Sequence, residues 1–297
     1  MKFDRWKSID RYTHVFRLFS KYHEYMNSMF WASVPTIGYA SGAIRKEIKL
    51  NQQLTTHEIL HIGKAIKNAN RVATDPNDYL EHLKEFENWN RLNTLVSACA
   101  YFETYLSSVV SLAIESDLGL LYSIPQKIDG ISVLKHNNGN EYSFFDKSEL
   151  ITKGEWPQRI SNFKKLFGVV PQELIDNTNS LEKMRVIRNN VAHAFGRDIK
   201  QSRDRNNLTI NPIERLSLER LQKYMGTLRS VAKAIDNQLL EKHIGEYELI
   251  YFYHIELKKN KLSGNPKELK KVFNGLGFQN RGLLFYKDLI EYYDNVN

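Results

Sequence analysis

Apolar residues recur at helical spacing along most of this chain, and this periodicity restricts the folds that are open to it. The pattern is clearest between Leu92 and Ala113, where apolar side chains stand three or four positions apart on one helix face. Such a helix must bury its apolar face against another element, so the chain is expected to be mostly α-helical. The residues of this face are Leu92, Leu95, Val96, Cys99, Phe102, Leu106, Val109 and Ala113.

The same period, together with helix start and stop signals, predicts helices elsewhere. A long helix is expected over Tyr79–Glu115, with Trp89 as the point where it could break. An interruption is expected at residues 33–42, where one proline and two glycines occur. The other helices are expected at His14–Phe30, Thr55–Val72, Trp156–Phe167, Leu181–Phe195, Leu216–His243, Pro266–Leu276 and Leu283–Tyr293.

Two segments favour β-structure instead. Tyr247–Leu257 is rich in aromatic residues and predicts a strand. Ile131–Leu134 and Tyr142–Phe145 flank an Asn138-Gly139 step, and that dipeptide between two short apolar runs predicts a small hairpin.

The composition of the chain changes after Gly245, which indicates a domain boundary. We expect an N-terminal helical extension at residues 1–88, a helical bundle at residues 89–243 and a small α+β appendage at residues 244–297.

The composition is that of a folded globular protein. With 297 residues, of which 42% are hydrophobic, the chain can bury a core without disulfides or metals. Cys99 is the single cysteine, so no internal disulfide can form. The first residues lack the apolar region of a signal peptide, and Glu103 and Glu115 interrupt the best candidate for a membrane span. These features predict a cytoplasmic protein that does not contact a membrane.

The formal net charge is +8. A basic protein attracts polyanions over long distances, and a nucleic acid releases counterions when it binds one. The charge therefore favours a nucleic-acid partner, although many basic proteins bind none.

The segment Met184–Gly196 carries the residues of greatest chemical interest. Asn189 and His193 lie four positions apart, so a helix places them on one stripe, and Arg188 stands beside that stripe. This spacing alone is poor support for a site, because Arg17 and His23 satisfy a looser version of it. We assign Arg17 and His23 no role.

An arginine, an amide and an imidazole are the groups that RNA transesterification needs. A base must take the proton of the attacking 2′-hydroxyl and an acid must protonate the leaving 5′-oxygen, and histidine can do either near neutral pH. A guanidinium can stabilise the negative charge on the phosphorane-like transition state. Asn189 can orient the imidazole or bind a phosphate oxygen. No metal or other cofactor is required.

The sequence Ile187-Arg188-Asn189-Asn190-Val191-Ala192-His193 resembles the Arg-Asn-x3-His signature of the HEPN superfamily of all-α domains. The resemblance covers roughly residues 89–243 and includes an earlier core helix with Phe102-Glu103 and the Trp156–Phe167 segment before the motif helix. It implies a HEPN-type bundle and a metal-independent RNA endonuclease that leaves a 2′,3′-cyclic phosphate. The catalytic residues would be Arg188, Asn189 and His193.

The resemblance carries further implications. Many of its members are ribonuclease toxins or antiviral effectors with the active site at a dimer interface, so it implies a homodimer and an antitoxin or regulatory partner. Glu103 is either an N–H or arginine partner on a core helix or, as the family pattern suggests, the group that orients Arg188. Phe195 stands where many members have tyrosine, which puts turnover in doubt. The alternative is a non-catalytic HEPN module for dimerisation or RNA binding.

Basic residues near the motif are candidates for contacts with the RNA backbone. Arg203 and Arg205 lie in a polar segment, residues 200–211, that predicts an exposed loop; Arg185 and Arg197 flank the motif more closely. Solvated surface charge is the other interpretation of these four residues.

A competing signal is His57-Glu58-Ile59-Leu60-His61, a literal His-Glu-x-x-His. On a helix the two histidines could bind zinc with Glu58 as general base, and Glu81 falls where a third ligand could occur. A zinc metallopeptidase is thus a third hypothesis. Against it, Thr55 and Glu58 fit a capping box, which puts the pair in the first turns of a solvated helix.

Overall fold

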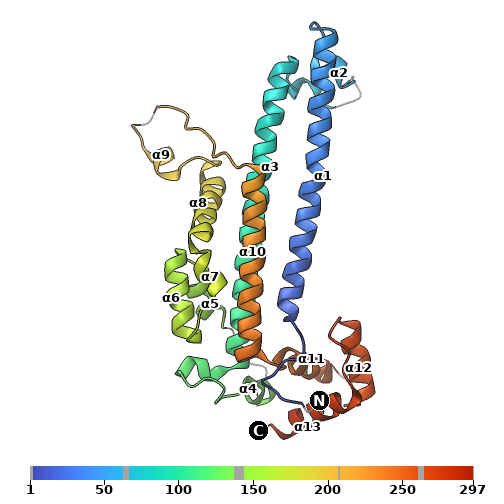
Figure 1. Cartoon of the computed structure of the whole chain (residues 1–297), viewed down its shortest axis with the longest axis vertical. Helices are drawn as coiled ribbons and strands as arrows, with labels where there is room; N and C mark the ends of the chain where they lie inside the picture. The colour runs from blue at the N-terminus through green and yellow to red at the C-terminus, as the bar shows by residue number, and fades with distance from the viewer. Residues whose placement is uncertain (1–2, 63–66, 137–143, 207, 260–263, 297) are drawn as a thin grey trace. The chain divides into compact units, whose positions relative to one another are not determined.

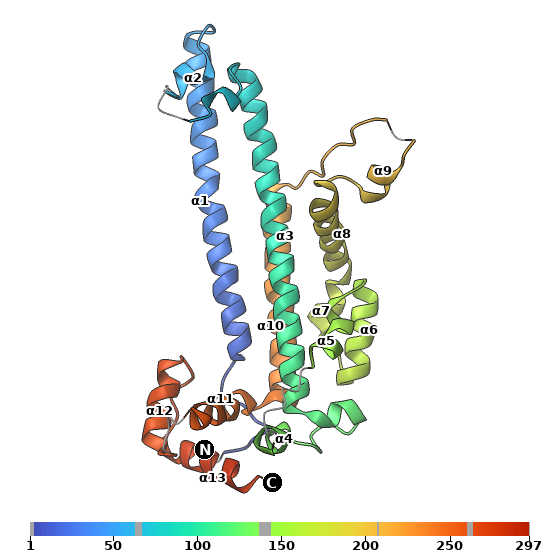
Figure 2. The same ribbon diagram turned by 180° about the vertical axis from the view of Figure 1, so that it is seen from behind.

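The computed structural model of the protein describes residues 3–62, 67–136, 144–206, 208–259 and 264–296. These residues are mostly helical (Figures 1 and 2), as predicted, and they form no β-strand, only an isolated bridge between Asp117 and Asp129. The α-helices are α1 (His14–Leu50), α2 (Thr56–Ile59), α3 (Pro76–Ser116), α4 (Gly130–His136), α5 (Phe145–Thr152), α6 (Trp156–Phe167), α7 (Gln172–Asp176), α8 (Thr178–Ala194), α9 (Ile199–Arg203), α10 (Leu218–Leu239), α11 (Tyr247–Lys258), α12 (Pro266–Gly275) and α13 (Leu283–Asn295). Short helices of other types are η1 (Ala69–Arg71), η2 (Leu118–Tyr122) and the π-helix η3 (Leu240–Ile244).

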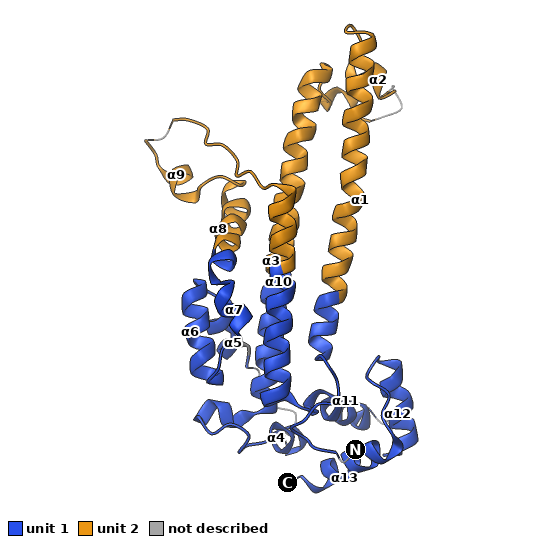
Figure 3. Ribbon diagram, viewed as in Figure 1, with its two compact units in different colours: residues 1–20, 101–182, 227–297 blue, residues 21–100, 183–226 orange. Residues whose placement is uncertain are grey.

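The chain divides into two compact units that are interleaved in sequence (Figure 3). Unit 1 contains residues 1–20, 101–182 and 227–297, and unit 2 contains residues 21–100 and 183–226. A compact unit is not necessarily a segment that folds on its own. The domain boundaries expected at residues 88/89 and 243/244 therefore remain predictions.

Helix α1 runs through the interruption predicted at residues 33–42, so that prediction was wrong. Pro35 cannot donate a backbone hydrogen bond, and a proline inside a helix costs about 3 kcal/mol. Two hydroxyl groups beside it bond to carbonyl oxygens of the preceding turn: Ser33 Oγ to Phe30 at 2.6 Å and Thr36 Oγ1 to Ala32 at 3.0 Å. The amide of Asn90 on α3 also donates to Ser33 Oγ at 2.7 Å, which ties this part of α1 to its neighbour in unit 2.

Helix α3 confirms the long helix expected over Tyr79–Glu115 and has no break at Trp89. It begins at Pro76, whose missing N–H is not needed in a first turn, and the Asp75 carboxylate accepts the N–H of Asn77 at 2.7 Å. Of the apolar face predicted on this helix, Val96 is half-buried and the other members are buried. Among the described residues, α3 is long and apolar enough to cross a membrane, since one 18-residue window of it has a mean hydropathy of 1.3, and half of that window is buried inside the protein.

The two β predictions were wrong. Ile131–Leu134 lies in α4, and Asn138-Gly139 and Tyr142 fall outside the described residues. Tyr247–Leu257 lies in α11, which packs against α4. Tyr247, Ile250 and Tyr253 are buried three residues apart on this helix, so packing outweighs the strand preference of aromatic and β-branched residues.

Helix starts and ends elsewhere follow the sequence closely. Helix α6 spans the predicted Trp156–Phe167, α12 and α13 occupy the two helices predicted in the tail, and η3 extends α10 toward the predicted end at His243. The helix expected over Thr55–Val72 is not formed, because α2 ends at Ile59.

The first turn of α1 is held by two carboxyl groups from the C-terminal third of the chain, both within unit 1. Asp236 accepts the N–H of Thr13 at 3.0 Å and its hydroxyl at 2.5 Å, and Glu248 accepts the N–H of His14 at 2.8 Å. These bonds satisfy N–H groups at the helix start that have no partner within the helix.

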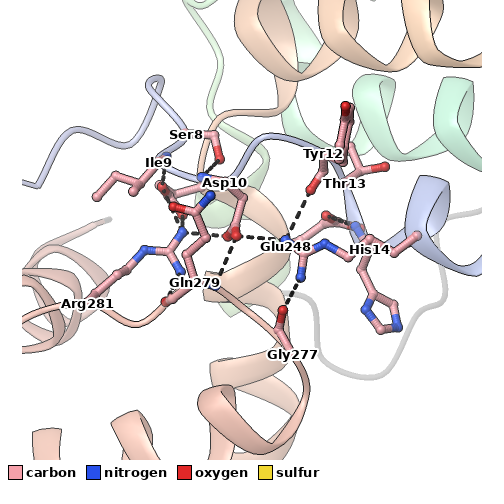
Figure 4. Close-up of polar contacts among 12 residues, drawn as sticks. Ser8, Ile9, Asp10, Tyr12, Thr13, His14, Glu248, Gly277, Gln279 and Arg281 are labelled. Atoms are coloured by element: carbon pink, nitrogen blue, oxygen red, sulfur yellow. Dashed lines mark hydrogen bonds and ion pairs between the residues drawn. The ribbon is translucent and has the colours of Figure 1, made fainter.

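A buried ion-pair network adjoins this turn (Figure 4). The Arg281 guanidinium donates to Asp10 at 2.6 Å and to Glu246 at 3.0 Å, and Asp10 also accepts from Arg17 at 2.7 Å. Glu246 accepts the N–H of Ile9 at 2.7 Å as well. The N-terminal segment is therefore fastened to the tail of the chain by charged groups with little solvent around them.

Candidate functional site

The predicted catalytic residues all lie on the second half of α8, which belongs to unit 2. Met184, Ile187 and Val191 are buried at the three- and four-residue spacing of one helix face, and they fix which way this half of the helix faces. Arg188 and Asn189 are half-buried beside that apolar stripe, and His193 is exposed. The helix thus holds the motif with its imidazole open to solvent.

The structure brings two of the three groups into contact. Arg188 Nη1 donates to Asn189 Oδ1 at 2.9 Å, so the amide holds one edge of the guanidinium. A guanidinium has five N–H donors, so one arginine can bond to several acceptors at once, and phosphate oxygens are among the acceptors that it binds well. The imidazole of His193 has no hydrogen bond to another side chain in the described part of the chain.

The end of α8 is a tight turn at Phe195 and Gly196, with φ angles of 52° and 77°. Gly196 N–H donates to Asn190 at 2.9 Å, and its carbonyl accepts from Glu214 at 2.7 Å. A Cβ on Gly196 would lie 2.9 Å from Cγ2 of Ile213, so glycine is required by both its conformation and its surroundings. Gly196 therefore provides the C-terminal stop of α8, directly after the predicted helix Leu181–Phe195.

Phe195 packs against an aromatic ring of α3. Its ring centroid lies 4.4 Å from that of Trp89, with 32° between the planes, and it is still 55% exposed. The guanidinium of Arg197 lies 5.3 Å from the same ring centroid and is anchored by a 2.8 Å bond from Nε to the carbonyl of Asn211. The bulky side chain of Phe195 is thus held in a defined, solvent-exposed position two residues from His193.

The four arginines proposed to contact RNA differ in exposure. Arg203, at the end of α9, and Arg205, in the loop that follows, are exposed, whereas Arg185 and Arg197 are half-buried. The exposed loop predicted at residues 200–211 is confirmed for residues 204–206 and 208–210. Residues 200–203 lie in α9, whose start is capped by Asp198, residue 211 is half-buried, and residue 207 lies outside the described residues.

Asn88 is a structural residue of this region that the sequence did not single out. It is 2% exposed on α3, donates to the carbonyl of Glu214 at 2.9 Å and accepts the N–H of Leu216 at 3.0 Å. These bonds fasten the segment that returns from the α9 loop to α10. An asparagine on a core helix has no pattern that marks such a role.

Glu103 accepts a hydrogen bond from Arg159 at 3.1 Å within unit 1. Arg159 is 4% exposed and lies on α6. This contact is the arginine pairing that the sequence allowed for Glu103, and orientation of Arg188 by Glu103 stays a prediction.

The His-Glu-x-x-His segment does not have the geometry that a zinc site on one helix face needs. Helix α2 ends at Ile59, His61 has a φ of 51°, and His57 Nε2 lies 2.9 Å from the carbonyl oxygen of Ala69. Glu58 forms the predicted capping box with Thr55, whose N–H and hydroxyl lower the pKa of the Glu58 carboxyl. Within the described ranges, no cluster of three or more potential metal ligands occurs.

Positive charge is concentrated near the motif. Residues 183–226 contain ten Lys and Arg against four Asp and Glu, a net charge of +6 out of +8 for the whole chain. A polyanion that bound this segment would therefore interact with most of the excess positive charge of the protein. The basic residues are Lys183, Arg185, Arg188, Arg197, Lys200, Arg203, Arg205, Arg215, Arg220 and Lys223.

No family model, curated protein or solved structure matches this chain. Its likeness to the HEPN superfamily therefore rests on the motif in α8 and the order of the helices around it, and membership stays a prediction.

Proposed function

We propose that the protein is a metal-independent RNA endonuclease in which Arg188, Asn189 and His193 form the catalytic group. The observation that carries this proposal is the end of α8, which presents the exposed imidazole of His193 and, five residues earlier, the Arg188 guanidinium bonded to the Asn189 amide. The concentration of positive charge in residues 183–226 fits a polyanionic substrate.

In the proposed reaction the 2′-hydroxyl oxygen forms a bond to the adjacent phosphorus, and the bond from phosphorus to the 5′-oxygen breaks. One base accepts the proton of the 2′-hydroxyl and one acid protonates the leaving oxygen, so the products are a 2′,3′-cyclic phosphate and a 5′-hydroxyl. Arg188 stabilises the charge on the non-bridging oxygens. Asn189 keeps the guanidinium in place through the bond at 2.9 Å.

Two proton transfers need two groups, and His193 is one of them. The resemblance to HEPN domains implies a homodimer in which two motif helices face each other, so the His193 of a second copy is proposed to perform the other transfer. The same resemblance suggests a cytoplasmic toxin or phage-defence effector, restrained by an antitoxin or regulatory partner.

The test is cleavage of an unstructured RNA by purified protein in EDTA, with analysis of the RNA ends. His193→Ala should lower the rate at least about 100-fold, since one acid–base group contributes 10²–10⁴-fold. His82→Ala is a matched control, because His82 is also an exposed helical histidine of unit 2 and should leave the rate unchanged. Circular dichroism should be the same for all three proteins.

The alternatives give different results. A non-catalytic dimerisation or RNA-binding module would dimerise or bind RNA without cutting it. A zinc peptidase would carry about one zinc per chain by elemental analysis and lose activity in EDTA and in Glu58→Gln. Equal RNA cleavage by the wild type and His193→Ala would refute the proposal.

A further inference from the structure

Phe195 has an unusual backbone conformation for a bulky residue. A φ of 52° lies in the left-handed region, where glycine and asparagine are common and other side chains are strained. Such strain costs about 1–3 kcal/mol and is concentrated at functional sites. The next residue, Gly196, also has a positive φ but is buried and has a structural reason for its identity, whereas the Phe195 ring points into solvent.

The surroundings of the ring favour an aromatic, negatively charged ligand. The Trp89 ring packs against the Phe195 ring at 4.4 Å, and the Arg197 guanidinium lies over the Phe195 ring, 5.3 Å from its centroid, with Asn211 fixing that cation. The Phe195 side chain stays 55% exposed between them, and this exposed part of the ring is what a base can contact. An apolar protein partner would have to desolvate the guanidinium, which is costly. A nucleotide offers a base that stacks on the ring and a phosphate that attracts the cation.

The position of the ring relates it to the proposed chemistry. Consecutive Cα atoms are about 3.8 Å apart, so the Cα atoms of His193 and Phe195 are at most about 7.6 Å apart. A nucleotide whose phosphate lies at His193 can therefore place a neighbouring base on Phe195.

We propose that Phe195, supported by Trp89 and flanked by Arg197, is a stacking platform for one unpaired nucleobase beside the phosphate that is cut. This inference rests on the proposed function and adds how the site selects its phosphate. A base inside a duplex is covered by its neighbours on both faces, so it cannot stack on a protein ring without leaving the helix. The platform therefore directs cleavage to phosphates with an unpaired nucleotide next to them.

The test measures binding of a fluorescent, unpaired RNA oligonucleotide in the His193→Ala background, where cleavage should be at least about 100-fold slower. Phe195→Ala should weaken binding roughly 5- to 150-fold, the range that one base–aromatic contact contributes. Phe195→Trp should bind as the parent does. Phe86→Ala is the matched control, because Phe86 is a 52% exposed phenylalanine of unit 2, and it should leave binding unchanged.

A second arm locates the base. An abasic nucleotide is placed in turn at each position of the RNA. At one position it should weaken binding by the parent as much as Phe195→Ala does, and it should cause no further loss in Phe195→Ala. The proposal is overturned if Phe195→Ala and Phe86→Ala weaken RNA binding equally. It is also overturned if, at every position, the loss of binding free energy from the abasic nucleotide adds fully to the loss from Phe195→Ala.

Sedimentation separates a role in subunit contact from one in RNA binding. If Phe195→Ala converts a dimer to a monomer and no abasic position matters, the ring serves the dimer and the platform is wrong. The stacking result and the cleavage result are independent: a protein that stacks the base but never cuts RNA refutes the proposed nuclease and leaves the platform standing.

Discussion

Two groups of arginines lie in contrasting environments: Arg17 and Arg281 in unit 1, and Arg203 and Arg205 in unit 2. In unit 1, Arg281 is 4% exposed and its guanidinium is held between Asp10 and Glu246. In unit 2, Arg203 and Arg205 are exposed beyond the motif helix, in a segment where basic residues outnumber acidic ones. Buried charges must be matched by partners, so the first group is committed to the fold. Exposed charges in excess of their partners are available to a ligand.

The largest effect on stability is expected from Arg281→Met, which leaves Glu246 buried without its ion-pair partner and Asp10 with Arg17 alone. Breaking a buried ion pair on one side costs about 3–5 kcal/mol in the free energy of unfolding, measured by chemical denaturation. Arg215→Met is the control in unit 2, where Arg215 forms a salt bridge with Glu85 and the two side chains are 59% and 42% exposed. It should cost at most about 1 kcal/mol. Equal losses in the two variants would remove the contrast between the regions.

The pH dependence of unfolding should sharpen the same contrast. Burial raises the pKa of Glu248 to about 8 and that of Asp236 to about 6, against ordinary values of 4.5 and 3.8. The N–H of His14 opposes the shift of Glu248, and the charge of Asp236 adds to it. The folded state then holds a proton on Glu248 that the unfolded state has lost above about pH 4.5.

The contribution of Glu248 to stability is therefore complete below that pH and is lost as the pH rises through about 8. Glu248→Gln, which stays neutral, should flatten the fall in unfolding free energy between about pH 6 and 8 by at most about 1.4 kcal/mol per pH unit. Parallel pH curves for the wild type and the variant would show that Glu248 is ionised in the fold.

The smallest effect on stability is expected from Arg203→Gln/Arg205→Gln, within about 0.5 kcal/mol. The consequence should appear in RNA binding, because each phosphate contact on a single strand contributes about 0.7 to the slope of log K against log salt. The double variant should lower that slope by about 1.4. Lys46→Gln/Lys49→Gln makes the same charge change on exposed residues of α1 and should leave the slope nearly as it was. If both double variants lower the salt slope by the same amount, the total charge of the protein, and not the position of the arginines, controls RNA binding.

Where the sequence failed as a guide to the fold, a local preference was outweighed by packing. Pro35 predicts an interruption, yet α1 continues through it, with Asn90 of α3 bonded to Ser33 beside the proline. Tyr247–Leu257 has the composition of a strand, yet it is helical because Tyr247, Ile250 and Tyr253 are buried at helical spacing. Chemical preferences of single residues are weak compared with the burial of a whole face.

The sequence predicts which residues make up the candidate site more readily than which residues pack around them. The burial of Met184, Ile187 and Val191 and the stop at Gly196 follow from helical period and backbone geometry, which are local. The contacts of Phe195 with Trp89 and of Asn88 with Glu214 join residues more than a hundred positions apart. No local pattern could indicate them.

The sequence by itself determined that the protein is mostly helical, where most of its helices lie, and which three polar groups share the end of α8, because helical period and turn residues act over a few neighbours. Only the tertiary structure decided that His57 and His61 do not share a helix face, that Phe195 is fixed in the open beside His193, and that Arg281 is buried between two carboxylates. Those outcomes depend on which distant segments pack together. Where packing buries a charged group, the group loses its hydration, and it needs an oppositely charged or hydrogen-bonding partner to offset that cost.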